Sequence, residues 1–82
     1  GEGEQVRYTS SKDGTVKYIF FYEAPVNSVA LHKLQLPKSA KLSLLGSKGK
    51  IRHQSTVDGT VISFPKNAFR GLAYVYVVKA ED

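Results

Sequence analysis

Hydrophobic and polar residues alternate over short segments of this chain, and turn-forming residues separate the segments. Such a pattern is typical of β-strands, and no stretch keeps the 3.6-residue apolar period of an amphipathic helix. The pattern predicts about seven strands in an all-β fold, a small antiparallel β-sandwich with a small barrel as the alternative. The predicted strands cover residues 6–10, 15–22, 28–36, 40–45, 51–55, 60–64 and 72–78.

Two of these segments, residues 16–22 and 72–78, are apolar at both odd and even positions. A strand of this kind is expected at the centre of a sheet with both of its faces covered. Segment 28–36 starts with Val29 and Leu31 on one face, and its later leucines fall on the other. This change of parity predicts a bulge or a bend near Lys33.

The tetrapeptide Asp-Gly-Thr-Val occurs twice, at residues 13–16 and 58–61. Asp-Gly between strand-like segments favours a hairpin, and we expect a type I′ turn because its two central residues need positive φ. A duplicated half-domain is the alternative, but nothing outside the tetrapeptides aligns, which favours reuse of one turn chemistry. Pro25, Pro37 and Pro65 stand where strands are expected to end, since proline lacks a backbone donor.

Length and composition fit a single small domain. The chain has 82 residues and no cysteine, so neither a disulfide nor a thiolate metal site is available. We expect residues 6–80 to form the domain and residues 1–5, which begin without a methionine, to be disordered or left by tag removal. No apolar run approaches the ~18 residues of a membrane span, and neither a membrane partner nor a cofactor is expected.

The formal net charge of +5 raises the question of nucleic acid, because clustered Lys and Arg attract phosphate. The densest basic stretch, Lys48, Lys50, Arg52 and His53, is short, and the other lysines are scattered. No glycine-aromatic signature of an RNA-recognition motif is present. We therefore expect a solvated basic surface and no nucleic-acid partner.

Candidate catalytic groups are few. A glycosidase needs two carboxyl groups about 5–9.5 Å apart across one bond. Asp13 and Asp58 are explained by their turns, and only Glu23 then remains away from the chain ends. His32 and His53 lie on different predicted strands without a carboxylate at ligand spacing, so each is expected to be solvent-exposed or bound to a backbone carbonyl. We expect no catalytic site and no metal site in this chain.

Exposed aromatic side chains can stack on sugar rings through their flat apolar faces. The chain has five Tyr, four Phe and no Trp, and most of these rings lie in the two most hydrophobic strands. Tyr8, Tyr22 and Phe69 are expected to be the exposed ones. Tyr22 and Phe69 are therefore the candidate sugar-contact residues of a carbohydrate-binding module, the alternative function for this chain.

Several short motifs follow one another in a particular order along the chain. An Arg-Tyr-Thr start is followed by a Tyr-Ile-Phe-Phe strand, Leu-Ser-Leu-Leu-Gly, an Asp-Gly hairpin that ends at a proline, and a closing Ala-Tyr-Val. These segments are residues 6–9, 18–21, 42–46, 51–54, 58–59, 61–65 and 73–77. Their order resembles the C-terminal β-sandwich domain of the α-L-fucosidase family of glycoside hydrolases. The chain departs from the family at His53, where a tryptophan is common, and at residues 23–25, which match a Trp-Pro corner loosely.

This resemblance implies a non-catalytic accessory domain that packs on the N-terminal catalytic (β/α) barrel of a retaining α-L-fucosidase and stabilises it. In that family the catalytic residues belong to the barrel, so none is carried over to this chain. Fucosylated glycans are the implied ligands of the parent enzyme. Such enzymes are exported to the periplasm or the cell exterior, or are lysosomal. An apolar patch on one sheet is then expected to be exposed in the isolated domain.

Overall fold

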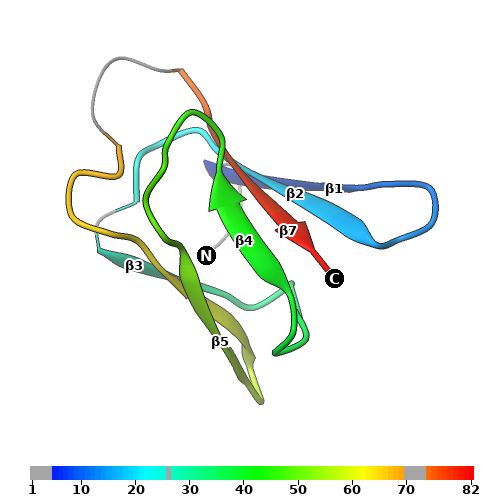
Figure 1. Ribbon diagram of the computed structural model, residues 1–82. Coiled ribbons are helices and arrows are strands. Elements are labelled where there is room, and N and C mark those ends of the chain that lie inside the picture. The colour runs from blue at the N-terminus through cyan, green and yellow to red at the C-terminus, as the bar shows by residue number, and fades with distance from the viewer. Residues whose placement is uncertain (1–4, 26, 70–73) are drawn as a thin grey trace.

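The computed structural model describes residues 5–25, 27–69 and 74–82, which form seven β-strands and no α-helix (Figure 1). The strands are β1 (Val6–Ser10), β2 (Val16–Phe21), β3 (Ser28–Leu31), β4 (Lys41–Leu44), β5 (Arg52–Thr56), β6 (Gly59–Ser63) and β7 (Tyr76–Glu81). The all-β prediction is confirmed. Of the segment 1–5, whose disorder was predicted, only Gln5 lies among the described residues.

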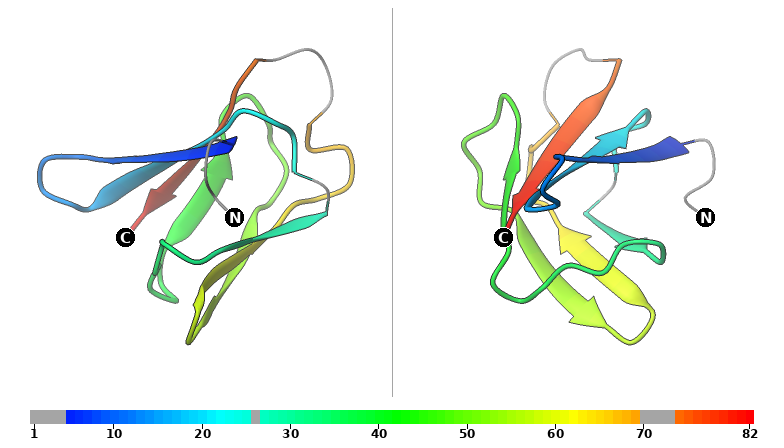
Figure 2. Two further views of the ribbon diagram at one scale, coloured as in Figure 1. Left: turned by 180° about the vertical axis from the view of Figure 1, so that it is seen from behind. Right: turned by 90° about the vertical axis from the view of Figure 1, so that its right-hand side faces the viewer.

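The strands form two antiparallel sheets that lie face to face as layers of a small β-sandwich (Figures 1 and 2). The four-stranded sheet has the order β1-β2-β7-β4, and the three-stranded sheet has the order β3-β6-β5. The two strands with apolar residues at both parities, β2 and β7, are the central strands of their sheet, as predicted. The last strand, β7, lies between β2 and β4, so it connects the β1–β2 hairpin to the edge strand β4 within one sheet.

The core lies between the inner faces of the two sheets. Ile19 and Val78 are paired on β2 and β7, and neither exposes any surface. From the other sheet, Leu31 and Ile62 are equally enclosed. The buried hydrophobic side chains of the described residues are Val6, Ile19, Phe21, Leu31, Leu34, Leu36, Ala40, Leu44, Ile51, Ile62, Val78 and Ala80.

The predicted strand 28–36 ends early, because the chain turns after Leu31 at His32 and Lys33. The predicted bend is therefore confirmed, but the residues after it do not continue the strand. They form an irregular connection that buries Leu34 and Leu36. Both parities of the segment are apolar because its first half faces the core from a sheet and its second half covers the core as a loop.

Polar side chains on the inner face of the three-stranded sheet bind the backbone of this connection. Thr60 donates to the Leu34 carbonyl oxygen at 2.8 Å and accepts from the Leu36 amide at 3.1 Å. The Ser55 hydroxyl donates to the Leu36 carbonyl oxygen. Because a buried backbone polar group without a partner is costly, these side chains allow a loop to cover the core without strand pairing.

The two predicted hairpins are present, but the type I′ turns are not. The second hairpin turns at Val57 and Asp58, between the paired residues Thr56 and Gly59, and neither turn residue has positive φ. In the first, the Gly14 amide donates to the Ser11 carbonyl oxygen at 3.0 Å, and only the glycine has positive φ. In both hairpins only the glycine of Asp-Gly has positive φ, and the aspartate before it does not. A type I′ turn would need positive φ at both residues.

The C-terminal strand differs from its predicted position. The prediction placed it at residues 72–78, of which 72 and 73 lie outside the described residues, and the structure places β7 at Tyr76–Glu81. Tyr74 is almost fully exposed ahead of the strand. The strand extends through Lys79 and Glu81 because Glu81 pairs with both Val16 of β2 and Lys41 of β4. Backbone pairing with β2 on one side and β4 on the other therefore keeps Lys79 and Glu81 in the strand, although the hydrophobic pattern placed them outside it.

Candidate functional site

The outer face of the four-stranded sheet carries a row of apolar side chains among polar and charged ones, although it faces away from the core. Residues that pair directly across strands project from the same side of a sheet. Phe20 of β2 therefore lies beside Val77 of β7, with Tyr18 in the next outward position of β2. The Leu45 amide donates to the Val77 carbonyl oxygen at 2.9 Å, which places Leu45 next to this row.

We call the set Tyr18, Phe20, Tyr22, Leu45 and Val77 the aromatic face. Tyr18, Phe20 and Val77 are partly buried by their neighbours, whereas Tyr22 is 50% exposed and Leu45 is 55% exposed. The prediction that β2 and β7 are covered on both faces is therefore wrong for this chain taken alone. One face meets the other sheet, and the outer face is left open by the described residues.

Basic side chains border the aromatic face. In the strand register, Arg7 of β1 lies opposite Phe20, and Lys41 of the edge strand β4 lies opposite Glu81. Lys79 lies opposite Tyr18 and forms an ion pair with Glu81, with its Nζ 3.3 Å from the carboxylate. Arg7 and Lys41 form no ion pair with the described carboxylates. The border consequently favours a partner surface that carries acidic groups.

The outer face of the three-stranded sheet is different. Its outward positions hold mainly small or polar residues that are exposed to solvent, and Val61 is the one larger apolar residue among them. The outward residues are Ser28, Ala30, Arg52, Gln54, Val61 and Ser63. A sheet face of this composition is stable in water, so the aromatic face is the surface that calls for an explanation.

The two candidate sugar-contact residues lie on different sides of the four-stranded sheet. Tyr22 follows β2 directly and is half exposed, as predicted. Phe69 is partly buried, which corrects the prediction that it is exposed. Its ring packs edge-on against Tyr76, at 4.9 Å between centroids, and against Phe64, at 4.8 Å. Tyr76 shares the inner face with Phe21, so the structure does not bring Tyr22 and Phe69 together.

A shallow hollow of about 260 Å³ lies beside Phe69. Asn27, Asn67 and Lys66 are among the residues that line it, and both asparagines have positive φ, at 60° and 66°. Amides donate and accept hydrogen bonds at once, as sugar hydroxyls also do. The hollow therefore contains residues whose side chains can form hydrogen bonds with hydroxyl groups. Sequence reasoning did not find Asn27 and Asn67, because isolated asparagines in loops carry no motif.

The candidate acid and base residues are dispersed. The Asp13 carboxylate accepts hydrogen bonds from the Thr15 amide at 3.0 Å and from the hydroxyls of Ser11 and Thr15 at 2.8 Å each. These bonds, the Thr15 amide first, lower the Asp13 pKa from 3.8 to about 2. The carboxylate is thus held ionised by its own turn, which suits a structural anchor and not a proton donor near neutral pH.

Each histidine contacts a backbone carbonyl oxygen. His53 Nε2 lies 2.9 Å from the Pro37 oxygen, and His32 Nδ1 lies 3.2 Å from the Asp58 oxygen. These contacts place His53 at the connection after β3 and His32 at the β5–β6 turn. In the part of the chain that the structure describes, no three His, Cys, Asp or Glu side chains are grouped in a way that could hold a metal ion.

Comparisons with known proteins give no relative: no protein-family model and no curated protein matches this sequence. Within residues 5–25, 27–69 and 74–82, no helix is long and apolar enough to cross a membrane. The functional argument therefore depends on the surface of the domain itself.

Proposed function

We propose that this chain is a non-catalytic accessory domain that docks through the aromatic face onto a larger catalytic domain. The observation that carries the proposal is the open outer side of the central strands β2 and β7, where Phe20, Val77 and Leu45 form a row. Contiguous apolar surface on a small domain marks an interaction site more often than it marks an ordinary solvated face. The polar outer face of the other sheet shows that this sequence does not need apolar residues on an exposed sheet.

For the partner we propose the (β/α) barrel of an α-L-fucosidase, which is the partner that the order of sequence motifs implies. Arg7 and Lys41, which form no ion pair with a described carboxylate, favour an acidic rim on that barrel. The apolar row would be buried at the centre of the interface, and the basic border would surround it, which is the usual arrangement of a domain–domain contact.

The test compares two charge-matched pairs of substitutions in the complete protein that the gene encodes. Tyr22→Asp with Leu45→Asp places two carboxylates on the aromatic face, and Ala30→Asp with Gln54→Asp places two on the outer face of the other sheet. An unpaired charge buried at an interface costs about 2 kcal/mol or more. We expect the first pair to lower the melting temperature of the complete protein and its fucosidase activity, and the second pair to leave both near wild type.

The same two double variants of the isolated domain provide the control for folding. All four sites are exposed, so each pair is expected to change the free energy of unfolding by less than about 1 kcal/mol. Equal sensitivity of the complete protein to both pairs would contradict docking through the aromatic face. A complete protein that depends on this face but does not hydrolyse a fucoside would retain the docking proposal and exclude the fucosidase barrel.

A second function, direct glycan binding, is favoured by the hollow beside Phe69, which Asn27 and Asn67 both line. Titration with a fucosylated oligosaccharide, followed by amide chemical shifts, tests it. We expect shifts at Asn27, Asn67 and Phe69, and at Tyr22 only if a second site exists there. No shift with millimolar sugar would contradict glycan binding.

A further inference from the structure

Three cationic side chains from two segments of the chain lie near Phe64 and Pro65, at the end of β6 that leads toward β7. Lys50 belongs to the loop between β4 and β5, Arg52 begins β5, and Lys66 follows Pro65. A hollow of about 340 Å³ is lined by Lys50, Arg52 and Ser63 together with Phe64 and Pro65. Lys66 lines the adjoining hollow of Phe69, which shares Phe64 and Pro65.

The fold explains why these cations meet. Arg52 and Ser63 are paired across β5 and β6 on the outer face of the three-stranded sheet. The loop before β5 packs closely on Pro65, since a Cβ added to Gly49 would lie only 2.6 Å from the Pro65 Cγ. Glycine at this position therefore brings the loop, and Lys50 with it, to the edge of the hollow.

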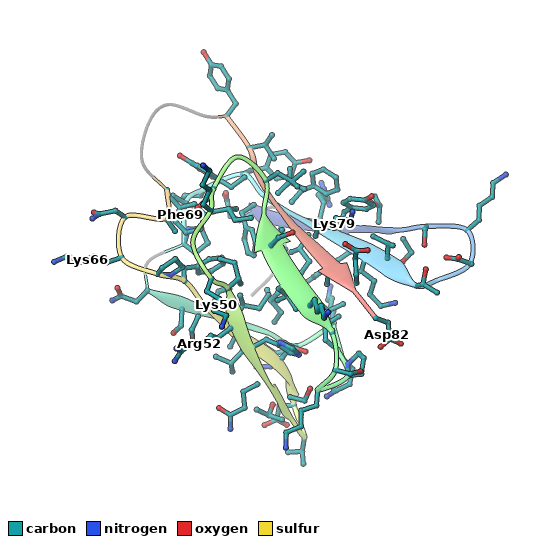
Figure 3. All side chains as sticks on the ribbon, viewed as in Figure 1. Lys50, Arg52, Lys66, Phe69, Lys79 and Asp82 are labelled. Carbon is teal, nitrogen blue, oxygen red and sulfur yellow. The ribbon has the colours of Figure 1, made fainter. Side chains whose placement is uncertain are left out.

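No described carboxylate neutralises this cluster. The ion pair found among the described residues joins Lys79 and Glu81, on the other sheet. Figure 3 shows Lys50, Arg52 and Lys66 on one side of the view and Asp82 on the other. Two like charges at this hollow, with Lys66 at the adjoining one, raise the local positive potential, which attracts anions and is not offset by a described carboxylate.

We propose that this hollow binds the carboxylate or sulfate group of an acidic saccharide. The Arg52 guanidinium presents a planar set of donors that fits an oxyanion, and Lys50 adds a second charge beside it. The volume lies within the range of about 300–1,000 Å³ that small-molecule sites occupy. The next sugar residue would reach the adjoining hollow, where Asn27 and Asn67 offer amides and Lys66 a further cation.

A saccharide fits this site better than a nucleic acid does. Single-stranded nucleic acids bind through open aromatic faces on which bases stack. Here Phe64 is partly buried and packs edge-on against Phe21, at 6.0 Å between centroids, and against Phe69, at 4.8 Å. These contacts occupy the rings, so recognition falls to the cations, the Ser63 hydroxyl and the neighbouring amides.

The inference deepens the glycan-binding function proposed above and does not involve the aromatic face. Its test is a chemical-shift titration of the present chain with trigalacturonate, a sulfated heparin oligosaccharide, neutral maltotriose, oligothymidylate and sodium sulfate, all at equal ionic strength. We expect both acidic saccharides to shift the amides of Lys50, Arg52 and Ser63, and maltotriose to leave them unchanged.

Two charge-matched double variants locate the site. Lys50→Gln with Arg52→Gln removes two cations from the hollow, whereas Lys12→Gln with Lys38→Gln removes two exposed cations elsewhere. Since the first variant removes charge-assisted hydrogen bonds to the carboxylate, it should weaken trigalacturonate binding at least about tenfold. The second should change it by no more than about twofold, through the lower net charge alone.

Four results would overturn the inference. Equal weakening by the two double variants would show unspecific attraction to a basic protein. Oligothymidylate that shifts the same amides with higher affinity would assign the hollow to nucleic acid, and sulfate ions that match the acidic saccharides would show an adventitious ion only. No shift with either acidic saccharide would exclude the site, while shifts at Asn27 and Asn67 with a fucosylated sugar would still leave the neutral glycan site in place.

Discussion

The two copies of Asp-Gly-Thr-Val, at residues 13–16 and 58–61, have the same sequence but different surroundings. In the first copy the aspartate organises an exposed turn, and a Cβ added to Gly14 would meet nothing within 4 Å. In the second copy the glycine is the structural centre. Gly59 is buried in β6 with φ of 138°, and a Cβ there would lie 2.1 Å from the Leu31 carbonyl oxygen.

The two threonines differ in the same way. Thr15 is exposed, and its hydroxyl donates to Asp13 within the turn. Thr60 is fully buried, and its hydroxyl holds the connection that follows β3. The tetrapeptide thus forms part of a chain reversal in both places. Only in the second copy do its residues, Gly59 and Thr60, also contact β3 and the connection that follows it. Two predictions compare the copies and a third concerns the Asp13 turn alone, in order of decreasing expected effect.

Gly59→Ala is expected to be far more destabilising than Gly14→Ala. At Gly14 the cost is that of placing alanine at φ of 76° in open space, about 1–2 kcal/mol. At Gly59 the unfavourable φ is combined with a clash against the Leu31 and His32 backbone, so the loss should be about 3 kcal/mol or more. Urea unfolding of both variants measures the two costs. Similar losses would mean that β3 can move away from Gly59, and the comparison would fail.

Thr60→Val should reduce stability by about 1–3 kcal/mol, because the Leu34 carbonyl and the Leu36 amide lose a buried partner. Thr15→Val removes one exposed hydrogen bond and should cost less than about 1 kcal/mol. Thermal unfolding of both is a suitable measurement, since about 1 kcal/mol corresponds to roughly 4–8 °C for a domain of this size. Faster amide exchange at Leu36 in Thr60→Val alone would support the assigned hydrogen bond. Unchanged exchange there would contradict it.

Asp13→Asn should change the dependence of stability on pH. The folded-state pKa of Asp13, about 2, lies below its ordinary value of 3.8, so the folded protein binds the proton less readily than the unfolded chain. This contribution to stability is present above about pH 4 and is lost as pH falls through 2. Asparagine cannot titrate, so the variant should lose less stability over this interval. Urea unfolding of the wild type and the variant between about pH 5 and about pH 2 measures this difference. The same dependence of the free energy of unfolding on pH in both proteins would refute the assigned role of Asp13.

Most of the fold could be predicted from the sequence. The alternating pattern located β1, β2, β5 and β6 closely, because each pairs along its whole length with a partner nearby in the chain. The end of β7 could not be located in this way, since Lys79 and Glu81 are held by pairing with strands distant in sequence. The connection after β3 was missed as well, because its backbone partners are the side chains of Thr60 and Ser55.

The surface sites were less predictable. Half exposure of Tyr22 follows from its place at the end of an apolar strand, and the structure confirms it. Phe69 was expected at the surface, but contacts with Phe64 and Tyr76 bury part of it. The hollow of Lys50 and Arg52 combines a strand, a loop and a proline, and the sequence shows only a short basic stretch there.

The residue pattern alone was enough to predict that the chain forms strands, where it reverses direction, and which two strands are central. These features depend on alternation, turn residues and local propensity, all of which act between neighbours in the chain. The packing of distant segments decided that one outer sheet face stays open, that Gly59 is buried while Gly14 is not, and that Lys50 and Arg52 share one hollow. Each of these depends on which distant segments lie side by side, and that is set by packing of the two sheets around Ile19, Ile62 and Val78.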